Sequence, residues 1–133
     1  MEIAGIRDPE AQVGIRDVWE HFIEVTSDVA YVLSPEGVFL AVNPGLCNML
    51  GQPRQQIVGT TMIERLDHEC LAVTQRVFQT IVEQRVAQKS TRTFRLVGSE
   101  RVTLEVNETP LIRDGGVWAI AGIGRDITQE IVL

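Results

Sequence analysis

One pattern constrains the fold of this chain more than any other: a strict alternation of apolar and polar residues in its last third. Val102, Leu104 and Val106 alternate with polar residues at the positions between them. Because successive side chains of a β-strand point to opposite faces, the pattern predicts a strand with one buried face and one face in water. The chain must therefore contain a sheet that is covered on at least one side.

Strand-like runs occur in two groups, before and after a central helical region. Residues 34–37 suit a type I turn inside the first group, and Asp114, Gly115 and Gly116 suit a turn inside the second. Because the strands cluster instead of alternating one by one with helices, we predict an α+β fold on an antiparallel sheet. The other predicted strands are 29–33, 38–42, 92–97 and 117–124.

The central region predicts several short helices and then one longer helix. Gly51, Pro53 and Gly59 interrupt residues 44–66, which favours short pieces over a single helix. Asp67 is a suitable N-cap for the longer helix that follows. Its apolar face is expected to carry Cys70, Leu71, Val77, Phe78, Ile81 and Val82.

An amphipathic helix is also predicted near the N-terminus, where Asp17 and Glu20 resemble a capping box. Its apolar stripe would leave a hydrophobic patch exposed unless another surface covered it, so we expect this helix to pair in a homodimer. The stripe consists of Val18, Trp19, Phe22, Ile23 and Val25.

Composition limits the partners of the chain. Its 133 residues suit one compact domain, and its net charge of −6 with a single lysine argues against direct binding to nucleic acid. No apolar run approaches the roughly 18 residues of a membrane span, and the N-terminus lacks the apolar core of a signal peptide. We therefore expect a cytoplasmic domain without membrane contact, in which Cys47 and Cys70 are free thiols.

Two groups of motifs carry a family resemblance. The first is Ser-Pro-Glu-Gly-Val-Phe-Leu-Ala-Val-Asn at 34–43, followed by Leu-Gly at 50–51 and Ile-Val-Gly at 57–59. The second is Thr-Pro-Leu-Ile-Arg-Asp-Gly-Gly at 109–116, followed by Gly-Ile-Gly-Arg-Asp-Ile-Thr at 122–128. In order and spacing these motifs resemble the PAS domain family of sensory modules, over roughly residues 28–128.

The resemblance implies a five-stranded antiparallel sheet with short helices and one longer helix across one face, preceded by the N-terminal amphipathic helix. Residues 1–27 would be a helical cap and dimerisation segment, 28–128 the PAS domain, and 129–133 the start of an exit helix. Asn43 is predicted to cap the helix that begins at Pro44. Asp126 and Thr128 are expected to fix the start of the exit segment and to pass on the signal.

PAS domains enclose a cavity between the sheet and the helices, so residues that face inward are candidate ligand contacts, although each also suits a plain core. Gly122 and Gly124 would let a ligand or backbone approach the sheet. Glu108 continues the buried face of its strand and is expected to reach solvent at the strand end, the alternative being a contact with a polar ligand group. The predicted ligand-binding residues are Tyr31, Leu33, Leu46, Met62, Leu66, Phe78, Phe94, Leu104, Val106, Trp118, Ile120 and Gly122.

The cofactors of the family find little support in this sequence. Some PAS domains hold haem through a histidine within the long helix, but His68 lies about one turn too early. Light-sensing members bond flavin to a cysteine after the position of Gly59, and residues 60–66 contain none. Histidines and cysteines lack the spacing of a metal site. Non-covalent flavin or a small apolar ligand stays open.

The leading interpretation is a non-catalytic sensory module of a signalling protein. Such a module would detect a small ligand or a partner domain and relay the signal to a histidine kinase, a diguanylate cyclase or a transcriptional regulator, as in two-component systems. A PAS domain without ligand, acting only in dimerisation and docking, is the alternative. A small enzyme of the cone-shaped, nuclear-transport-factor-like group is less consistent with a hairpin that precedes the helices.

Overall fold

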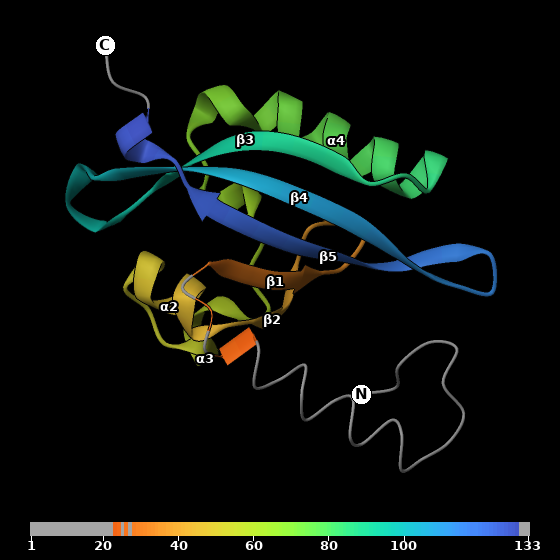
Figure 1. The fold of residues 1–133 in the computed structure, drawn as a ribbon, viewed down its shortest axis with the longest axis horizontal. Coiled ribbons are helices and arrows are strands. Elements are labelled where there is room, and N and C mark those ends of the chain that lie inside the picture. Colours follow the sequence, from red (N-terminus) through yellow and green to blue (C-terminus); the bar gives the residue numbers. More distant parts are fainter. Residues whose placement is uncertain (1–22, 25, 27, 131–133) are drawn as a thin grey trace.

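The computed structural model describes residues 23, 24, 26 and 28–130, and its centre is one antiparallel five-stranded sheet (Figure 1). The strands lie in the order β2-β1-β5-β4-β3, so the last strand of the chain pairs with the first. The strands are β1 Val29–Leu33, β2 Phe39–Val42, β3 Gln88–Arg95, β4 Arg101–Arg113 and β5 Gly116–Asp126.

Helices fill the connection between β2 and β3. The α2 helix packs beside β1, and the longer α4 helix runs along β3 and contacts β4 and β5 (Figure 1). The α-helices are α2 Pro44–Leu50, α3 Arg54–Ile57 and α4 Leu71–Gln84. Short 3₁₀ turns are η1 Ile63–Arg65, η2 His68–Cys70, η3 Val97–Ser99 and η4 Thr128–Glu130.

Local sequence accounts for the two tight hairpins. Between β1 and β2, the amide of Gly37 donates to the carbonyl of Ser34 at 2.9 Å, which closes the predicted turn. Between β4 and β5, Asp114 and Gly115 both have positive φ, at 52° and 78°. Two residues with positive φ form the hairpin turn whose twist matches the flanking strands, and Asp-Gly is a preferred pair for it.

Asn43 holds β1 and α2 together. Its side-chain oxygen accepts from the amides of Leu46 and Ala30, both at 3.0 Å, so it caps α2 and pairs with a strand residue as well. Its side-chain nitrogen donates to the carbonyls of Asp28 and Ile23, at 2.9 and 3.1 Å. The predicted cap is confirmed, and the same residue also ties the start of the domain to the sheet.

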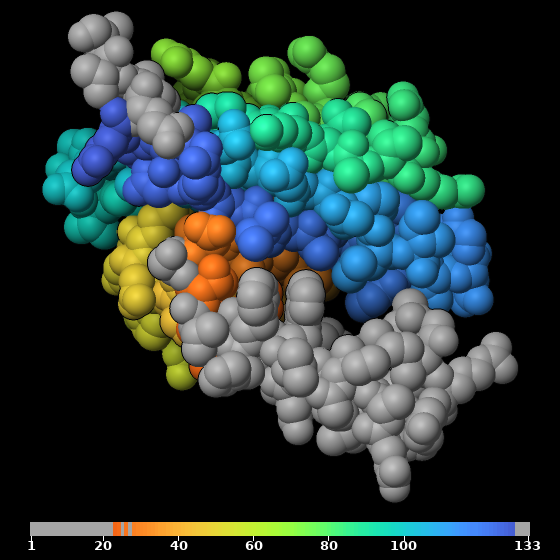
Figure 2. All heavy atoms as spheres, in the orientation of Figure 1, coloured from red at the N-terminus to blue at the C-terminus, as the bar shows by residue number. Residues whose placement is uncertain are grey.

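The core lies between the inner face of the sheet and the helices. It combines Tyr31, Leu33 and Ile120 from the sheet with Leu46 and Phe78 from the helices. In the space-filling view the blue residues of β4 and β5 cross the visible face, and the yellow-green helical segment after β2 gathers at one end (Figure 2). Among the described residues, no helix has the length and apolar character needed to cross a membrane.

The α+β fold on a five-stranded antiparallel sheet is confirmed, and two details of the sequence interpretation need correction. Asp67 does not cap the long helix, because η2 intervenes and the Asp67 carboxylate instead lies 3.4 Å from Arg101. β3 begins four residues before and ends two residues before the predicted strand 92–97, and β5 extends beyond 117–124 at both ends. Val38 lies outside β2, bridged to Thr61. Of the predicted dimerisation stripe only Ile23 lies within the described residues.

Candidate functional site

A cluster of polar side chains is buried where the core was expected to be apolar. Two terminal nitrogens of Arg92 each donate to a separate oxygen of Glu108 at 2.5 Å, and the Tyr31 hydroxyl donates to Glu108 at 2.7 Å. The Arg92 and Glu108 side chains are fully shielded from solvent. Such a two-pronged ion pair is among the strongest polar contacts in proteins. Arg92, Glu108 and Tyr31 are called the buried polar cluster below.

Strand register explains how three strands build this cluster. Gly122 of β5 is the partner of Tyr31 on one side and of Glu108 on the other. A Cβ atom at Gly122 would lie 2.2 Å from a carbon of the Tyr31 ring, so the ring occupies the space that a side chain would need. The missing side chain lets Tyr31 reach across β5 to Glu108.

The pKa of Tyr31 is raised well above its ordinary value of 10.0, first because the phenol is buried and second because the Glu108 carboxylate lies beside it. The hydroxyl therefore stays protonated at neutral pH and acts as a donor to the carboxylate. Glu108 thus accepts hydrogen bonds from two partners on two different strands.

Two further side chains cover Arg92 on the helix side. The centre of the Phe78 ring lies 5.0 Å from the guanidinium carbon, and the sulfur of Met62 lies 3.3 Å from one terminal nitrogen. The Nε of Arg92 on β3 and the hydroxyl oxygen of Thr74 on the buried side of α4 have no hydrogen-bond partner in the protein, as is also true of Arg65 Nε elsewhere. Buried polar atoms without a partner in the protein are uncommon, and each calls for an explanation such as a bound water or another polar molecule.

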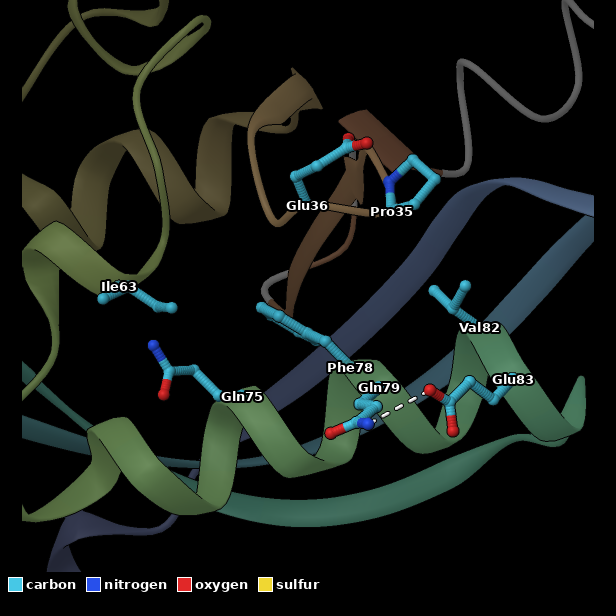
Figure 3. Close-up of a pocket in the computed structure, with 8 residues that line it drawn as sticks. All are labelled: Pro35, Glu36, Ile63, Gln75, Phe78, Gln79, Val82 and Glu83. Carbon is cyan, nitrogen blue, oxygen red and sulfur yellow. Dashed lines mark hydrogen bonds between the residues drawn. The ribbon is translucent and has the colours of Figure 1, made fainter.

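A surface groove lies on the outer side of Phe78. It has a volume of about 420 Å³ and separates the β1–β2 turn from α4. Figure 3 shows Phe78 projecting from α4 toward Pro35 and Glu36, with Ile63 and Gln75 at one end of the groove. Phe78 is therefore the side chain that both lines the groove and covers Arg92.

Most of the predicted ligand-binding residues come together in the core. Tyr31 belongs to the buried polar cluster, and Met62 and Phe78 contact its Arg92 directly. Gly122 is buried beneath the Tyr31 ring. Their role as ligand contacts stays a prediction. The remaining predicted residues that lie in the core are Leu33, Leu46, Leu66, Phe94, Leu104, Val106 and Ile120.

Trp118 lies outside the core, and the prediction that its side chain faces inward is wrong. Leu111 pairs with Ala119 and Ile112 pairs with Val117, so Trp118 is an extra residue in a β-bulge. The bulge breaks the alternation along β5, so Val117 packs against the core. The Trp118 ring instead lies 4.4 Å from the guanidinium carbon of Arg113.

The expectation that Glu108 reaches solvent is also wrong, because β4 extends five residues beyond it and Arg92 pairs with it.

Two buried polar residues, Arg92 and Thr74, were not predicted from the sequence. A usable signal for Arg92 was its position two residues before Phe94, which places both on the buried face of β3. Opposite charges on the buried faces of neighbouring strands indicate a buried pair.

At the end of β5, Asp126 organises the exit from the sheet. Its carboxylate accepts from the backbone amide of Thr128 at 2.9 Å and from the Thr128 hydroxyl at 2.6 Å. The Thr128 hydroxyl oxygen in turn accepts from the amide of Thr103 on β4 at 3.0 Å. The predicted structural role of Asp126 and Thr128 therefore has a geometric basis, while their signalling role stays a prediction.

Comparison with known proteins gives consistent results. A family profile described as PAS fold matches residues 23–131. The PAS domain of a protein from Colwellia psychrerythraea has a TM-score of 0.76 and 17% identity over 86% of this chain and 98% of its own. A search of curated proteins found no significant match.

Two further solved structures come from signalling proteins. A domain of a sensory box sensor histidine kinase/response regulator from Geobacter sulfurreducens has a TM-score of 0.68 and 23% identity over 84% of this chain and 94% of its own. The PAS domain of a LuxR-family transcriptional regulator from Burkholderia thailandensis, solved in complex with ethanol, has a TM-score of 0.67 and 13% identity over 83% and 97%.

Proposed function

The chain belongs to the PAS family, and on that premise we propose that it is a non-catalytic sensory module that binds a small ligand at the buried polar cluster. The observation that carries this proposal is the pair of buried polar atoms without partners, Arg92 Nε and the Thr74 hydroxyl. Neither atom has a hydrogen-bond partner in the protein, and a buried polar group that is left unsatisfied costs about 1–3 kcal/mol. A bound polar ligand would remove that cost.

The ion pair itself supports a role other than stability. Apolar residues of similar volume often stabilise a core as well as a buried ion pair does, because desolvation of two charges is costly. The Arg92–Glu108 pair also holds a phenol, a sulfur and an aromatic ring around it. Such an arrangement suits a site that recognises a polar group.

The fold offers a route for the signal. Glu108 pairs with Gly122 on β5, and the same strand ends at Asp126, whose carboxylate orders Thr128. A ligand that alters the contacts of Glu108 would shift β4 against β5 and change the geometry of the exit segment. We propose that this movement reaches an output domain of a larger cytoplasmic protein, such as a histidine kinase, a diguanylate cyclase or a transcriptional regulator.

Two further parts of the proposal concern partners. The domain would work as a homodimer through the N-terminal stripe, and its net charge of −6 leaves any contact with DNA to another domain. The ethanol complex of the Burkholderia thailandensis domain supports a small ligand as the occupant.

A second candidate function is docking without any ligand. It is favoured by the complete burial of core side chains such as Leu33, Phe39 and Ile120, which fill the interior. In that case the buried polar cluster would only fix the arrangement of three strands.

Native mass spectrometry distinguishes the two functions. The purified chain, incubated with a small-molecule extract of its expression host, is weighed in native and in denaturing solvent. Ligand sensing predicts a native mass above the denatured mass, with the excess lost in the Arg92→Met variant. Equal masses under both conditions contradict ligand sensing and favour docking.

A further inference from the structure

We propose that Arg92 Nε and the Thr74 hydroxyl bind a small neutral molecule that carries a hydrogen-bond acceptor, and that this molecule enters past Phe78 from the surface groove. The inference rests on the ligand-binding function proposed above and adds the chemical class of the ligand and its path. Three observations carry it: the charge balance of the cluster, the position of Thr74 on α4 and the position of Phe78.

Charge balance favours a neutral ligand. Within the described residues, Arg92 and Glu108 are the charged side chains of the buried class, and their charges cancel. A carboxylate ligand would place a second anion beside Glu108 without a second cation to compensate. Burial of an uncompensated charge is far more costly than burial of a neutral polar group.

The donors that remain define which atoms the ligand needs. Both terminal nitrogens of Arg92 donate to Glu108, and Nε is the nitrogen of this side chain without a hydrogen-bond partner in the protein. It requires an acceptor, such as a carbonyl or hydroxyl oxygen. The Thr74 hydroxyl can donate or accept, so it matches the other polar atom of an amide or alcohol.

Helix geometry places Thr74 beside the same region. Thr74 lies four residues before Phe78 on α4, so the two side chains share one face of the helix about one turn apart. Phe78 packs over the Arg92 guanidinium, and both Thr74 and Phe78 belong to the buried side of α4. The Thr74 side chain therefore lies on the face of α4 that Phe78 turns toward Arg92.

Phe78 separates this site from solvent. Its ring is held on one side by Arg92 and on another by Gly37, where an added Cβ atom would lie 2.8 Å from the ring. The groove of about 420 Å³ lies in front of the ring and offers space into which it can rotate (Figure 3). Rotation of one side chain would open the site without movement of the backbone.

Acetamide and acetate form a matched pair of probes, because they have nearly the same shape and differ in charge. Each is titrated into the ¹⁵N-labelled chain while the Nε–H resonance of Arg92 is followed by NMR, assigned by its loss in Arg92→Lys. We expect acetamide to shift this resonance in a saturable manner and acetate to leave it in place.

Thr74→Val tests the second contact, and Thr80→Val on the same helix is the matched control. Because one hydrogen bond is lost, we expect Thr74→Val to weaken acetamide binding about five-fold. Its unfolding midpoint should be unchanged or raised, and Thr80→Val should bind acetamide as the original chain does.

The entry path is tested separately. Phe78→Leu is expected to raise the association rate of acetamide several-fold, while Gln79→Ala at the groove surface leaves that rate unchanged.

Three outcomes would overturn the inference: acetate binds as well as acetamide, the Arg92 resonance responds to neither probe because only water occupies the site, or Thr74→Val binds acetamide normally. An unchanged association rate in Phe78→Leu would refute the path. If native mass spectrometry finds a retained compound while the Arg92 resonance does not respond, the ligand-sensing function is supported and the site at Arg92 and Thr74 is refuted. If neither experiment finds binding, the ligand-sensing function and the proposed site are both refuted.

Discussion

At the scale of single residues, the environment of a side chain decides its role more than its type does. Glu108 would be solvated at a strand end, but here Tyr31 of β1 and Arg92 of β3 hold it inside the core. Arg92 is likewise buried among Glu108, Met62 and Phe78. The same two strands carry another pair of opposite charges, Lys89 and Glu105, but there the Lys89 side chain is exposed and the Glu105 side chain is half-buried.

The Arg92–Glu108 pair and the Lys89–Glu105 pair join the same two strands and allow a matched comparison. Arg92→Met leaves Glu108 buried without its partner, so we expect a loss of about 3–5 kcal/mol in the free energy of unfolding. The double variant Arg92→Met with Glu108→Leu should regain much of that loss. Lys89→Met, at an exposed pair, should cost less than about 1 kcal/mol. Urea unfolding measures all three, and a double variant less stable than Arg92→Met alone would refute the argument.

Tyr31 is the single tyrosine of the chain, so its ionisation can be followed directly. Because folding raises the pKa of this phenol above 10.0, its protonated form stabilises the fold fully below pH 10 and the contribution is lost as pH rises further. We expect tyrosinate absorbance to appear only together with unfolding, at a pH above 10. Tyr31→Phe should show a weaker decline of stability in that range. Ionisation at pH 10 in a folded chain would contradict the expectation.

At the scale of elements, β5 connects the parts of the site. It lies between β1 and β4, and its Gly122 leaves the space through which Tyr31 reaches Glu108. Its bulge at Trp118 turns the tryptophan away from the core, and its end at Asp126 orders the exit segment. One strand therefore positions the cluster and also leads out of the domain.

Gly122→Ala tests the row formed by Tyr31, Gly122 and Glu108. A Cβ atom at Gly122 would lie 2.2 Å from the Tyr31 ring, which must move and lose its bond to Glu108, so we expect a loss of about 3 kcal/mol in the free energy of unfolding. Gly124→Ala on the same strand is the control, since its nearest neighbour, a methyl carbon of Val106, lies 3.1 Å away. Thermal and urea unfolding compare the two variants. Equal losses would show that the Tyr31 ring is not the obstacle.

At the scale of the whole molecule, the first strand of the domain pairs with the last, so the segments just before β1 and just after β5 both adjoin one sheet. Asn43 binds the carbonyl of Ile23 on one side, and Asp126 orders Thr128 on the other. A change in the core is therefore close to both segments through which a sensory domain would communicate.

The homodimer prediction belongs to this scale, and its residues apart from Ile23 lie outside the described part of the chain. We expect light scattering to give twice the mass of 14.8 kDa. Trp19→Glu and Phe22→Glu should shift the equilibrium to monomers, because they place a charge in the apolar stripe. Glu20→Gln on the same predicted helix serves as the control. A chain that stays monomeric at high concentration would contradict the prediction.

The sequence by itself determined the features that depend on near neighbours along the chain. Period-two alternation predicted β4, the turn residues at 34–37 and 114–116 predicted both hairpins, and Asn43 before Pro44 predicted a helix cap. The motifs of the two halves identified the family. These features could be predicted because they follow from backbone geometry within a few residues.

Only the tertiary structure decided the chemistry of the interior. The pairing of Arg92 with Glu108 depends on the register of β3 against β4, and the reach of Tyr31 depends on Gly122 in the strand between. A bulge of one residue reversed the expected direction of Trp118. Register and bulges are set by contacts between segments far apart in sequence, so the alternation along one strand could not reveal which side chains meet.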